Sequence, residues 1–361
     1  MMAINMPQIE INFIKAAETA LKRSERGVVC LILSDTTDEG FRSVKYTKAS
    51  EVEAAKFTAA NAEIIKSAFL GNPECVYVVR FDKADETLAA DLADTLSAIK
   101  FNWAAAPVDT ATQAALKTWL QGFNSSNPNH QRKAVLYNTD ACNDMHIVNF
   151  ATTAMTMADS TSSVTAAGYT ARIAGLLAGL PMTESATYKI LDDVKSVTEP
   201  ADLDAAVNGG KLILFNDEGV VRVARGVNSL TTATTSQIEA MKKIAVVETM
   251  DLIKADISRL FKDSYCGRFR NSADNQALFV AAINSYFEQL VNEGILDENG
   301  ENKAEIDVDA QRAALAAIGK AVKEWDDNKV KETTVGANIY VKGSVGILDC
   351  IEDFVFNITM N

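Results

Sequence analysis

The stretch Lys211-Leu-Ile-Leu-Phe-Asn-Asp-Glu-Gly-Val-Val-Arg-Val-Ala224 is the part of the chain around which the fold can be predicted. Its first five residues form an apolar run that is typical of a buried strand, and Asn216–Gly219 form a polar turn. After the turn, Val221 and Val223 alternate with Arg222, as expected for a strand that buries one face. The stretch therefore predicts two strands joined by a turn.

A polar corner and a long helix follow these strands. The corner is Arg225-Gly-Val-Asn-Ser-Leu-Thr-Thr232, and Ser236 with Glu239 has the spacing of a capping box. We therefore expect a helix from Ser236 to about Lys262. The apolar residues that would form its inward stripe are Ile238, Met241, Ala245, Met250, Ile253, Ile257 and Leu260. The stretch contains no histidine and no nucleophile beside a base, so these residues predict a structural core.

Length and composition restrict the class of protein. A chain of 361 residues favours two domains. Its formal charge of −13 and pI near 4.8 argue against nucleic acid as a partner, because phosphate binding needs a basic surface. An odd number of dispersed cysteines fits reduced thiols in a cytoplasm, and the N-terminus has no signal-peptide pattern. The five cysteines are Cys30, Cys75, Cys142, Cys266 and Cys350.

The segment Val164–Leu180 is the stretch that most resembles a membrane span. It is too short to cross a bilayer, and Arg172 lies in its middle. Gly175 and Gly179 are four residues apart, so we expect a helix of a soluble protein whose glycines permit close packing.

Apolar runs and amphipathic segments alternate between residues 27 and 150. This alternation predicts an N-terminal α/β domain with a mostly parallel sheet. The predicted strands are Gly27–Leu33, Cys75–Arg80, Phe101–Ala105, Lys133–Asn138 and His146–Phe150, and the predicted helices are Glu51–Phe69, Ala84–Ile99 and Thr110–Gln121. The Thr/Ser/Ala-rich run Ala151–Ser163 is the expected boundary.

A second domain of mixed α/β structure is expected after this boundary. We expect an amphipathic helix around 279–290, then a hairpin over 294–308 with an Asn299-Gly300 turn. A helix over Ala310–Asp326 and a strand over 337–342 should follow. The last segment, 352–360, alternates apolar and polar residues and is predicted to be an extended strand.

The sequence contains no recognisable catalytic or binding motif. The phosphate-loop, dinucleotide, nucleophile-elbow and zinc-protease patterns are all missing. Of the two histidines, His130 lies in a predicted loop and His146 at a predicted strand start, where a solvated or core histidine is expected. We therefore predict no catalytic residue, no cofactor and no metal. A cytoplasmic α/β enzyme acting on a small molecule is the alternative interpretation.

Two motifs resemble a known family. The corner 225–232 with a long helix containing Val246-Val-Glu-Thr-Met250 resembles the C-terminal domain of contractile tail sheath proteins of myophages and R-type bacteriocins. The run 171–188, an Ala/Gly-rich helix ending before Pro181 and a Ser/Thr–Tyr segment, resembles the same family. The resemblance covers 166–361 well, 6–35 moderately and 36–163 hardly at all.

The resemblance implies a structural subunit rather than an enzyme. Many copies would stack helically around an inner tube and contract to drive it through a cell envelope. The expected partners are further copies of the chain, the inner tail tube protein, and baseplate and tail terminator proteins, without nucleic acid or membrane insertion. The expected location is the bacterial cytoplasm during assembly and then the tail sheath of a phage or phage-tail-like particle.

The resemblance also divides the chain and gives both ends a role. It implies an N-terminal linking arm (1–25), an outer α/β domain (26–158), a sheath-type C-terminal domain (159–345) and a C-terminal linking strand (346–361). Isolated strands are unstable, and sheath termini donate theirs to neighbouring subunits. The expected linking residues are Ile9, Ile11, Phe13, Phe354, Phe356 and Ile358. The alternative is that each terminus completes the sheet of its own domain.

Basic residues share one face of the predicted helix Ala310–Asp326. Arg312 and Lys323 fall on one line with Lys320 beside them, roughly opposite an apolar stripe. The stripe consists of Leu315, Ile318, Val322 and Trp325. A solvated outer face is the ordinary explanation, whereas the resemblance implies contact with the inner tube.

Overall fold

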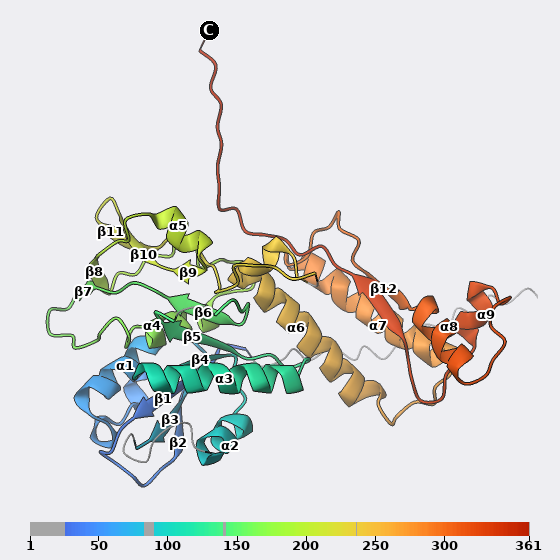
Figure 1. Cartoon of the computed structure of the whole chain (residues 1–361), viewed down its shortest axis with the longest axis horizontal. Coiled ribbons are helices and arrows are strands. Elements are labelled where there is room, and N and C mark those ends of the chain that lie inside the picture. Colours follow the sequence, from blue (N-terminus) through green and yellow to red (C-terminus); the bar gives the residue numbers. More distant parts are fainter. Residues whose placement is uncertain (1–25, 83–89, 140–141, 236, 361) are drawn as a thin grey trace, which may run out of the picture.

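The computed structural model describes residues 26–82, 90–139, 142–235 and 237–360. Figure 1 shows a layered α/β body, a second group of helices beside it, and a C-terminal segment that projects away from both. The predicted mixed α/β class with a mostly parallel sheet is confirmed.

The body is built on a seven-stranded sheet with the order β2-β3-β1-β4-β5-β6-β9. Every neighbouring pair is parallel except β2–β3. The strands are β1 Val28–Ser34, β2 Ser43–Tyr46, β3 Cys75–Phe81, β4 Trp103–Ala105, β5 Lys133–Tyr137, β6 Ile147–Phe150 and β9 Lys211–Leu212. The five strands predicted between residues 27 and 150 are thus present within a few residues. Strand β2 was not predicted, and β9 is the beginning of the predicted strand Lys211–Phe215.

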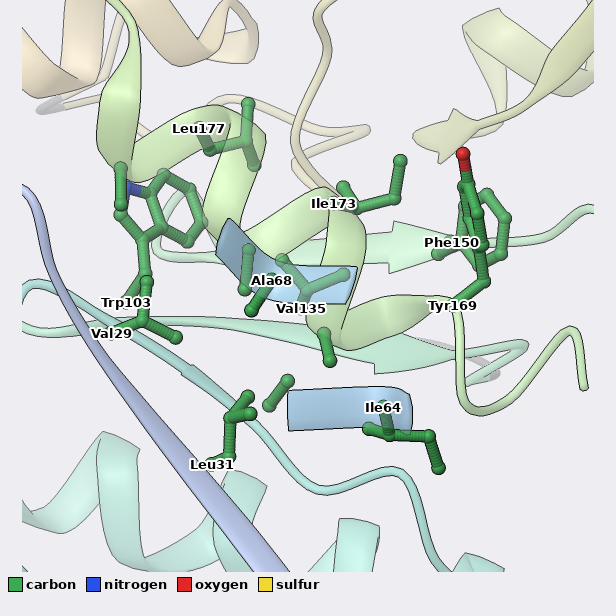
Figure 2. Close-up of a cluster of buried hydrophobic side chains, with 14 of the residues drawn as sticks. Val29, Leu31, Ile64, Ala68, Trp103, Val135, Phe150, Tyr169, Ile173 and Leu177 are labelled. Carbon is green, nitrogen blue, oxygen red and sulfur yellow. The ribbon is translucent and has the colours of Figure 1, made fainter. Parts of the chain in front are cut away.

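Helices cover both faces of the sheet. One core lies between the sheet and α1 (Ala59–Phe69) and α4 (Thr170–Gly179), and Figure 2 shows its side chains. The other core includes side chains of α2 (Ala90–Ala98) and α3 (Thr110–Ser126). Helix α1 begins later than predicted. The segment before α1 forms two 3₁₀ turns, and Thr58 caps α1 by accepting a bond from Asn61.

The body extends across the expected domain boundary at residue 158. Helix α4 and strand β9 both come after that residue, yet α4 packs on α1 and β9 pairs with β6. Residues from both sides of the boundary share one hydrophobic core. Three smaller elements lie beside it, β7 Met155–Met157, β8 Val194–Val197 and α5 Leu203–Asn208.

The stretch 211–261 differs from the prediction in two places. The first predicted strand is divided, because β9 joins the large sheet whereas β10 (Leu214–Asp217) pairs with β11 (Val220–Val223). The long helix, α6, spans Ile244–Leu260 and is preceded by a 3₁₀ turn at Glu239–Lys242. It starts late because residues 242–244 bond to the corner. The amide of Asn228 donates to Lys242, and the amide of Ile244 donates to Gly226. Ser236 lies outside the described residues.

The predicted hairpin over 294–308 is wrong. Helix α7 (Ala273–Asn292) is followed by a turn, and β12 (Lys303–Ile306) then pairs with β13 (Val341–Ser344). The partner of β12 therefore comes from the C-terminal part of the chain, and the Asn299-Gly300 turn does not join two paired strands.

The predicted single helix Ala310–Asp326 is also wrong. Helix α8 ends at Ala317, and a separate short helix, α9, spans Asp327–Glu332. Gly319 has φ +82°, and the amides of Gly319 and Lys320 donate back to Ala316 and Leu315. This is a Schellman motif, which ends a helix by satisfying its last carbonyl groups.

The contact between α1 and α4 depends on glycines. A Cβ atom at Gly175 would overlap the carbonyl oxygen of Ala68, and one at Gly179 would overlap that of Gly71. The two backbones are therefore in direct contact, which confirms the predicted role of the α4 glycines. The same packing keeps α4 against β4 and β5.

We predict that Gly175→Ala destabilises the protein by about 3 kcal/mol, the upper end of the usual cost of overpacking a core. The matched control is Gly122→Ala in α3, where an added Cβ meets nothing within 4 Å. That change should stabilise by up to about 1 kcal/mol because alanine favours helix. Urea unfolding of both variants checks the prediction, and equal stabilities would contradict it.

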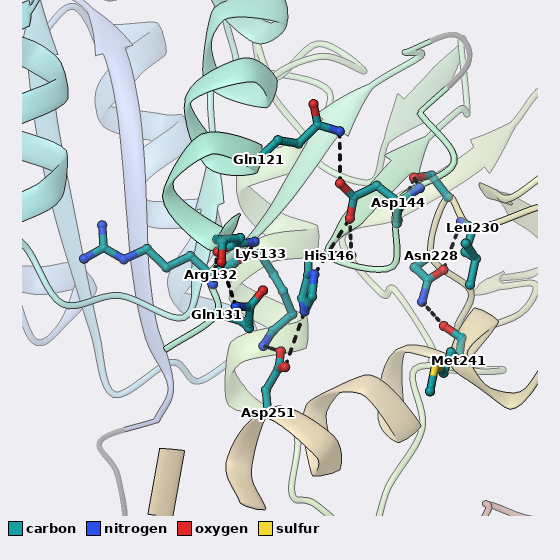
Figure 3. Close-up of polar contacts among 12 residues, drawn as sticks. Gln121, Gln131, Arg132, Lys133, Asp144, His146, Asn228, Leu230, Met241 and Asp251 are labelled. Carbon is teal, nitrogen blue, oxygen red and sulfur yellow. Dashed lines mark hydrogen bonds and ion pairs between the residues drawn. The ribbon is translucent and has the colours of Figure 1, made fainter. Parts of the chain in front are cut away.

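A buried charged network joins α6 to the large sheet (Figure 3). Lys133 Nζ lies 2.9 Å from Asp251 Oδ2 and 3.1 Å from Glu248 Oε1. His146 Nε2 lies 3.3 Å from the other oxygen of Asp251. Arg26 completes the network by donating to Glu248 over 2.7 Å. Two carboxylates on α6 are thereby held by Lys133 at the start of β5 and by Arg26 just before β1.

The network shifts the pKa values of its members in opposite directions. Burial alone would raise the pKa of the Asp251 carboxyl, but Lys133 and His146 hold that pKa well below its usual range. Burial alone would lower the pKa of Lys133, yet Asp251 and Glu248 raise it. Both groups therefore stay charged in the folded protein at neutral pH.

We predict that Lys133→Met costs about 3–5 kcal/mol at pH 7, because it removes the buried cation that Asp251 and Glu248 share. Ionised Asp251 contributes stability above its unfolded pKa of about 4, and this contribution is lost as the pH falls toward the lower folded pKa. The variant lacks the contribution, so its deficit should narrow below about pH 4.

Urea unfolding of wild type and variant between pH 7 and pH 3.5 measures the deficit. The control is Arg26→Met, which removes a cation that is partly exposed and should cost about 1 kcal/mol or less. A deficit that is constant with pH would contradict the prediction.

Candidate assembly interface at the C-terminal arm

Residues 354–360, here called the C-terminal arm, extend away from the rest of the chain (Figure 1). The predicted strand is extended but pairs with no strand of the described residues. Phe354, Phe356 and Ile358 are 83%, 69% and 72% exposed, and the rings of Phe354 and Phe356 stack with centroids 6.0 Å apart. Exposed apolar side chains at this density mark a surface that another molecule covers.

The segment just before the arm, residues 349–353, is the arm root, and it is held tightly. The Glu352 side chain is only 4% exposed. Its Oε1 accepts hydrogen bonds from Ser185 Oγ at 2.8 Å and Thr187 Oγ1 at 2.5 Å. Its Oε2 lies 3.2 Å from Lys243 Nζ and 3.9 Å from Arg225 Nε. A buried carboxylate between two hydroxyls and two cations fixes the arm root to the body.

Two neighbouring acids strengthen this attachment. Asp349 pairs with Lys243, and Asp353 pairs with Arg225. Burial alone would lower the pKa of Lys243, but Asp349 and Glu352 raise it, so the ammonium group stays charged. Lys243 binds Asp349 and Glu352, and Arg225 binds Glu352 and Asp353. Because the chain is held on both sides of Glu352, it leaves the body at a fixed place and in a fixed direction.

The hydroxyl groups that bind Glu352 come from the Ser/Thr–Tyr segment of the run 171–188, where the family resemblance implies a strand. The structure has irregular turns there instead. Thr187 Oγ1 also accepts a hydrogen bond from the amide of Gly226 at 2.9 Å, and a Cβ at Gly226 would lie 3.0 Å from Ser185 Oγ. The corner and the loop therefore pack closely at this glycine. No local pattern in the sequence indicates this role of Glu352, since its partners lie more than 100 residues away in the chain.

The two-stranded sheet β12–β13 offers an edge to a further strand. Asn284 of α7 binds both main-chain polar groups of Ala304, at 3.0 Å and 2.7 Å, and so occupies the outer edge of β12. Ala304 lies opposite Gly343, and Ile306 lies opposite Val341. Because antiparallel pairs alternate, the amides of Val341 and Gly343 point outward from β13. Among the described residues, no hydrogen bond to these two amides is found.

The three basic residues expected on one face are separated in the structure. Arg312 lies on α8 and donates to the carbonyl groups of Val322 and Trp325, at 3.0 Å and 2.7 Å, and to Asp327 at 2.7 Å. It thus ties the following loop to α8. Lys320 and Lys323 lie in that loop and are exposed. The N-terminal linking residues Ile9, Ile11 and Phe13 lie outside the described residues.

Metal sites, histidine sites and membrane spans are the other features to consider in the described ranges. These ranges contain no cluster of three or more His, Cys, Asp or Glu placed to hold a metal ion. Of the two histidines, His146 belongs to the buried network, and His130 lies 3.4 Å from Lys262. No helix of the same ranges has both the length and the apolar character to span a membrane.

Comparison with known proteins identifies the family. Residues 84–229 match the central domain of phage tail sheath proteins, and residues 236–361 match the phage tail sheath C-terminal domain. The chain is 32% identical to the tail sheath protein of Clostridium phage phiCD119 over 98% of both chains.

Solved structures share the fold. The sheath tail protein of Desulfitobacterium hafniense has a TM-score of 0.67 at 18% identity, over 83% of this chain and 94% of that one. The contracted helical sheath of the anti-feeding prophage has a TM-score of 0.71 at 13% identity, over 99% of this chain and all of the other. The matched proteins are structural, and the comparisons give no support to the enzyme alternative. The chain belongs to the phage tail sheath family.

Proposed function

We propose that this sheath subunit links to its neighbours by donating the C-terminal arm, and that the linked copies form a helical, contractile sheath around an inner tube. The observation that carries the proposal is the combination of an exposed apolar arm with a fixed root. Residues 354–360 pair with no strand among the described residues of their own copy. They can complete the sheet of another copy.

Burial of the arm supplies enough free energy for such a link. Fully burying a Phe, Ile or Met side chain contributes about 1.5–3 kcal/mol. The arm exposes Phe354, Phe356, Ile358 and Met360, and part of this gain offsets the entropy lost when the arm becomes ordered. The free energy that remains stabilises each link, and the link is repeated between the many copies of an assembly.

The proposed acceptor is the outer edge of β13 in a neighbouring copy. The outward amides of Val341 and Gly343, which have no hydrogen-bond partner among the described residues, can donate to an incoming strand. Asn284 already occupies the edge of β12 at Ala304. One edge is thus presented and the other is partly closed. We propose a second link through the N-terminal arm, residues 1–25, with Ile9, Ile11 and Phe13 on its apolar face; this link rests on the family resemblance.

Contraction requires no nucleotide in this scheme. The energy is the difference between two packings of the same linked subunits, an extended one and a shorter, wider one. Contacts between copies that run head to tail without closing a ring produce an open helix. The arms keep neighbours connected while the bodies rotate and slide.

The tube contact is proposed at Lys320 and Lys323, with Arg312 holding their loop in place. Both lysines are exposed, and each exposed ion pair contributes only about 0–1 kcal/mol. Single contacts of this strength break readily during contraction, whereas a ring of copies still grips the tube. Baseplate and tail terminator proteins would bind at the two ends, and assembly would take place in the bacterial cytoplasm before the sheath becomes part of a particle.

We predict that deleting residues 354–361 yields a folded monomer that does not assemble. The deletion removes the exposed side chains but keeps the root contacts of Glu352 and Asp353. The unfolding midpoint should therefore stay near that of wild type. Negative-stain microscopy and sedimentation measure tube formation, and normal tubes from the truncated protein would exclude arm donation.

The same assay tests the acceptor edge. Val341→Pro removes the outward amide of β13, so it should block assembly while leaving the monomer folded. Val341→Ala is the matched control, because it loses similar packing but keeps the amide. Equal assembly of the two variants would place the acceptor elsewhere.

We predict that the double change Lys320→Glu and Lys323→Glu prevents extended sheath from forming on the tube, yet permits assembly of sheath without tube. The control is Lys66→Glu with Lys195→Glu, which alters net charge equally at exposed positions of the body. Co-sedimentation with purified tube protein at several salt concentrations compares tube binding by the two double variants. Equal tube binding by both double variants would argue against this contact.

A further inference from the structure

A groove of about 700 Å³ lies between the arm root and the loop from Thr183 to Lys189. Tyr188 lines one wall and Ile351 lines the other. Tyr188 is 53% exposed and Ile351 is 98% exposed, so apolar surface faces solvent on both sides. Most of the nearby charge is already paired, Glu184 with Lys189 and Asp349 with Lys243. The groove therefore suits a polypeptide surface better than a small ion.

Tyr188 has an unfavourable backbone conformation. Its φ is +59°, the left-handed region that bulky residues rarely adopt. The conformation is held by its amide, which donates to Val223 at 2.9 Å, and by its carbonyl group, which accepts from Arg222 at 3.3 Å. Glycine would fit this conformation without strain. A strained, half-exposed aromatic ring indicates a role beyond folding.

The ring is also placed firmly. It meets Phe215 of β10 edge to face, with centroids 5.3 Å apart, and Ile190 nearby in the chain is exposed as well. Rigid aromatic side chains that remain half-exposed are favoured as anchors in protein interfaces, since little entropy is lost when they are covered.

We propose that this groove is a second contact surface for another copy of the chain, namely the copy that receives the arm. Ile351 and Phe354 are three residues apart, which is about 10 Å in an extended chain. A neighbouring copy that binds Phe354 is therefore brought against the groove. Tyr188 and Ile351, on the two walls, then contact the surface of that copy. The inference rests on arm donation and adds a rigid contact beside the flexible one.

The native thiol of Cys350 reports on the groove, because it is half-buried and belongs to the groove wall. Maleimide labelling, resolved by peptide mass spectrometry, compares the full-length monomer with assembled sheath. We expect labelling of Cys350 to slow by at least about tenfold on assembly. Equal rates in the two states would overturn the proposal.

Two variants test the walls of the groove. Tyr188→Gly relieves the backbone strain and removes the ring, so the monomer should stay folded while assembly needs about tenfold more protein. Tyr188→Phe keeps the ring and should assemble like wild type. Ile351→Ser changes a side chain that is almost fully exposed in the monomer, so it tests the other wall without affecting the fold.

The outcomes separate the groove from the arm. If both Tyr188→Gly and Ile351→Ser assemble at the wild-type concentration, the groove is not a contact, even when truncation of the arm blocks assembly. If the truncated protein itself assembles, arm donation fails instead. Should Tyr188→Gly fail to fold, the Ile351→Ser variant and Cys350 labelling decide.

Discussion

The direct backbone contact between α1 and α4 is the constraint on which the rest of the structure depends. Gly175 and Gly179 leave no room for a side chain against α1, so α4 can lie in only one position on the sheet. The chain that leaves α4 becomes the loop carrying Ser185 and Thr187, and these hydroxyls bind Glu352. The place at which the arm leaves the molecule is therefore set by a helix contact in the body, far from the arm in sequence.

Helix α6 connects the arm root to the sheet. Lys243, the N-cap residue of α6, binds Asp349 and Glu352, and Asp251 near the middle of the helix binds Lys133 at the start of β5. These two residues are about 12 Å apart along the helix axis. A force on the arm thus reaches the body through charged contacts at the start and in the middle of one rigid helix. This arrangement suits a subunit that must move with its neighbours without losing its own fold.

The sequence predicted what depends on local patterns. Buried strands such as β1 and β3 are continuous apolar runs, and the glycine spacing of α4 indicated close packing. Contacts between distant residues left no such pattern. Glu352 lies 165 residues from Thr187, and β12 pairs with β13 rather than across the nearby Asn299-Gly300 turn. The predicted helix Ala310–Asp326 is too long because its apolar stripe continues past Gly319. The positive φ of Gly319 ends α8 before that point.

The arm and its root divide two tasks that one kind of contact could not perform. Charged and hydroxyl groups around Glu352 are directional, so they fix where the arm begins, but their bonds lie within one subunit and do not bind a neighbour. Apolar side chains such as Phe354 and Phe356 are not directional, but each adds affinity in proportion to the area buried. A link with only apolar contacts could slip by two residues along an edge strand, because alternation repeats at that step. A fixed root removes this freedom, since a slipped register would leave the arm too short or too long for its acceptor.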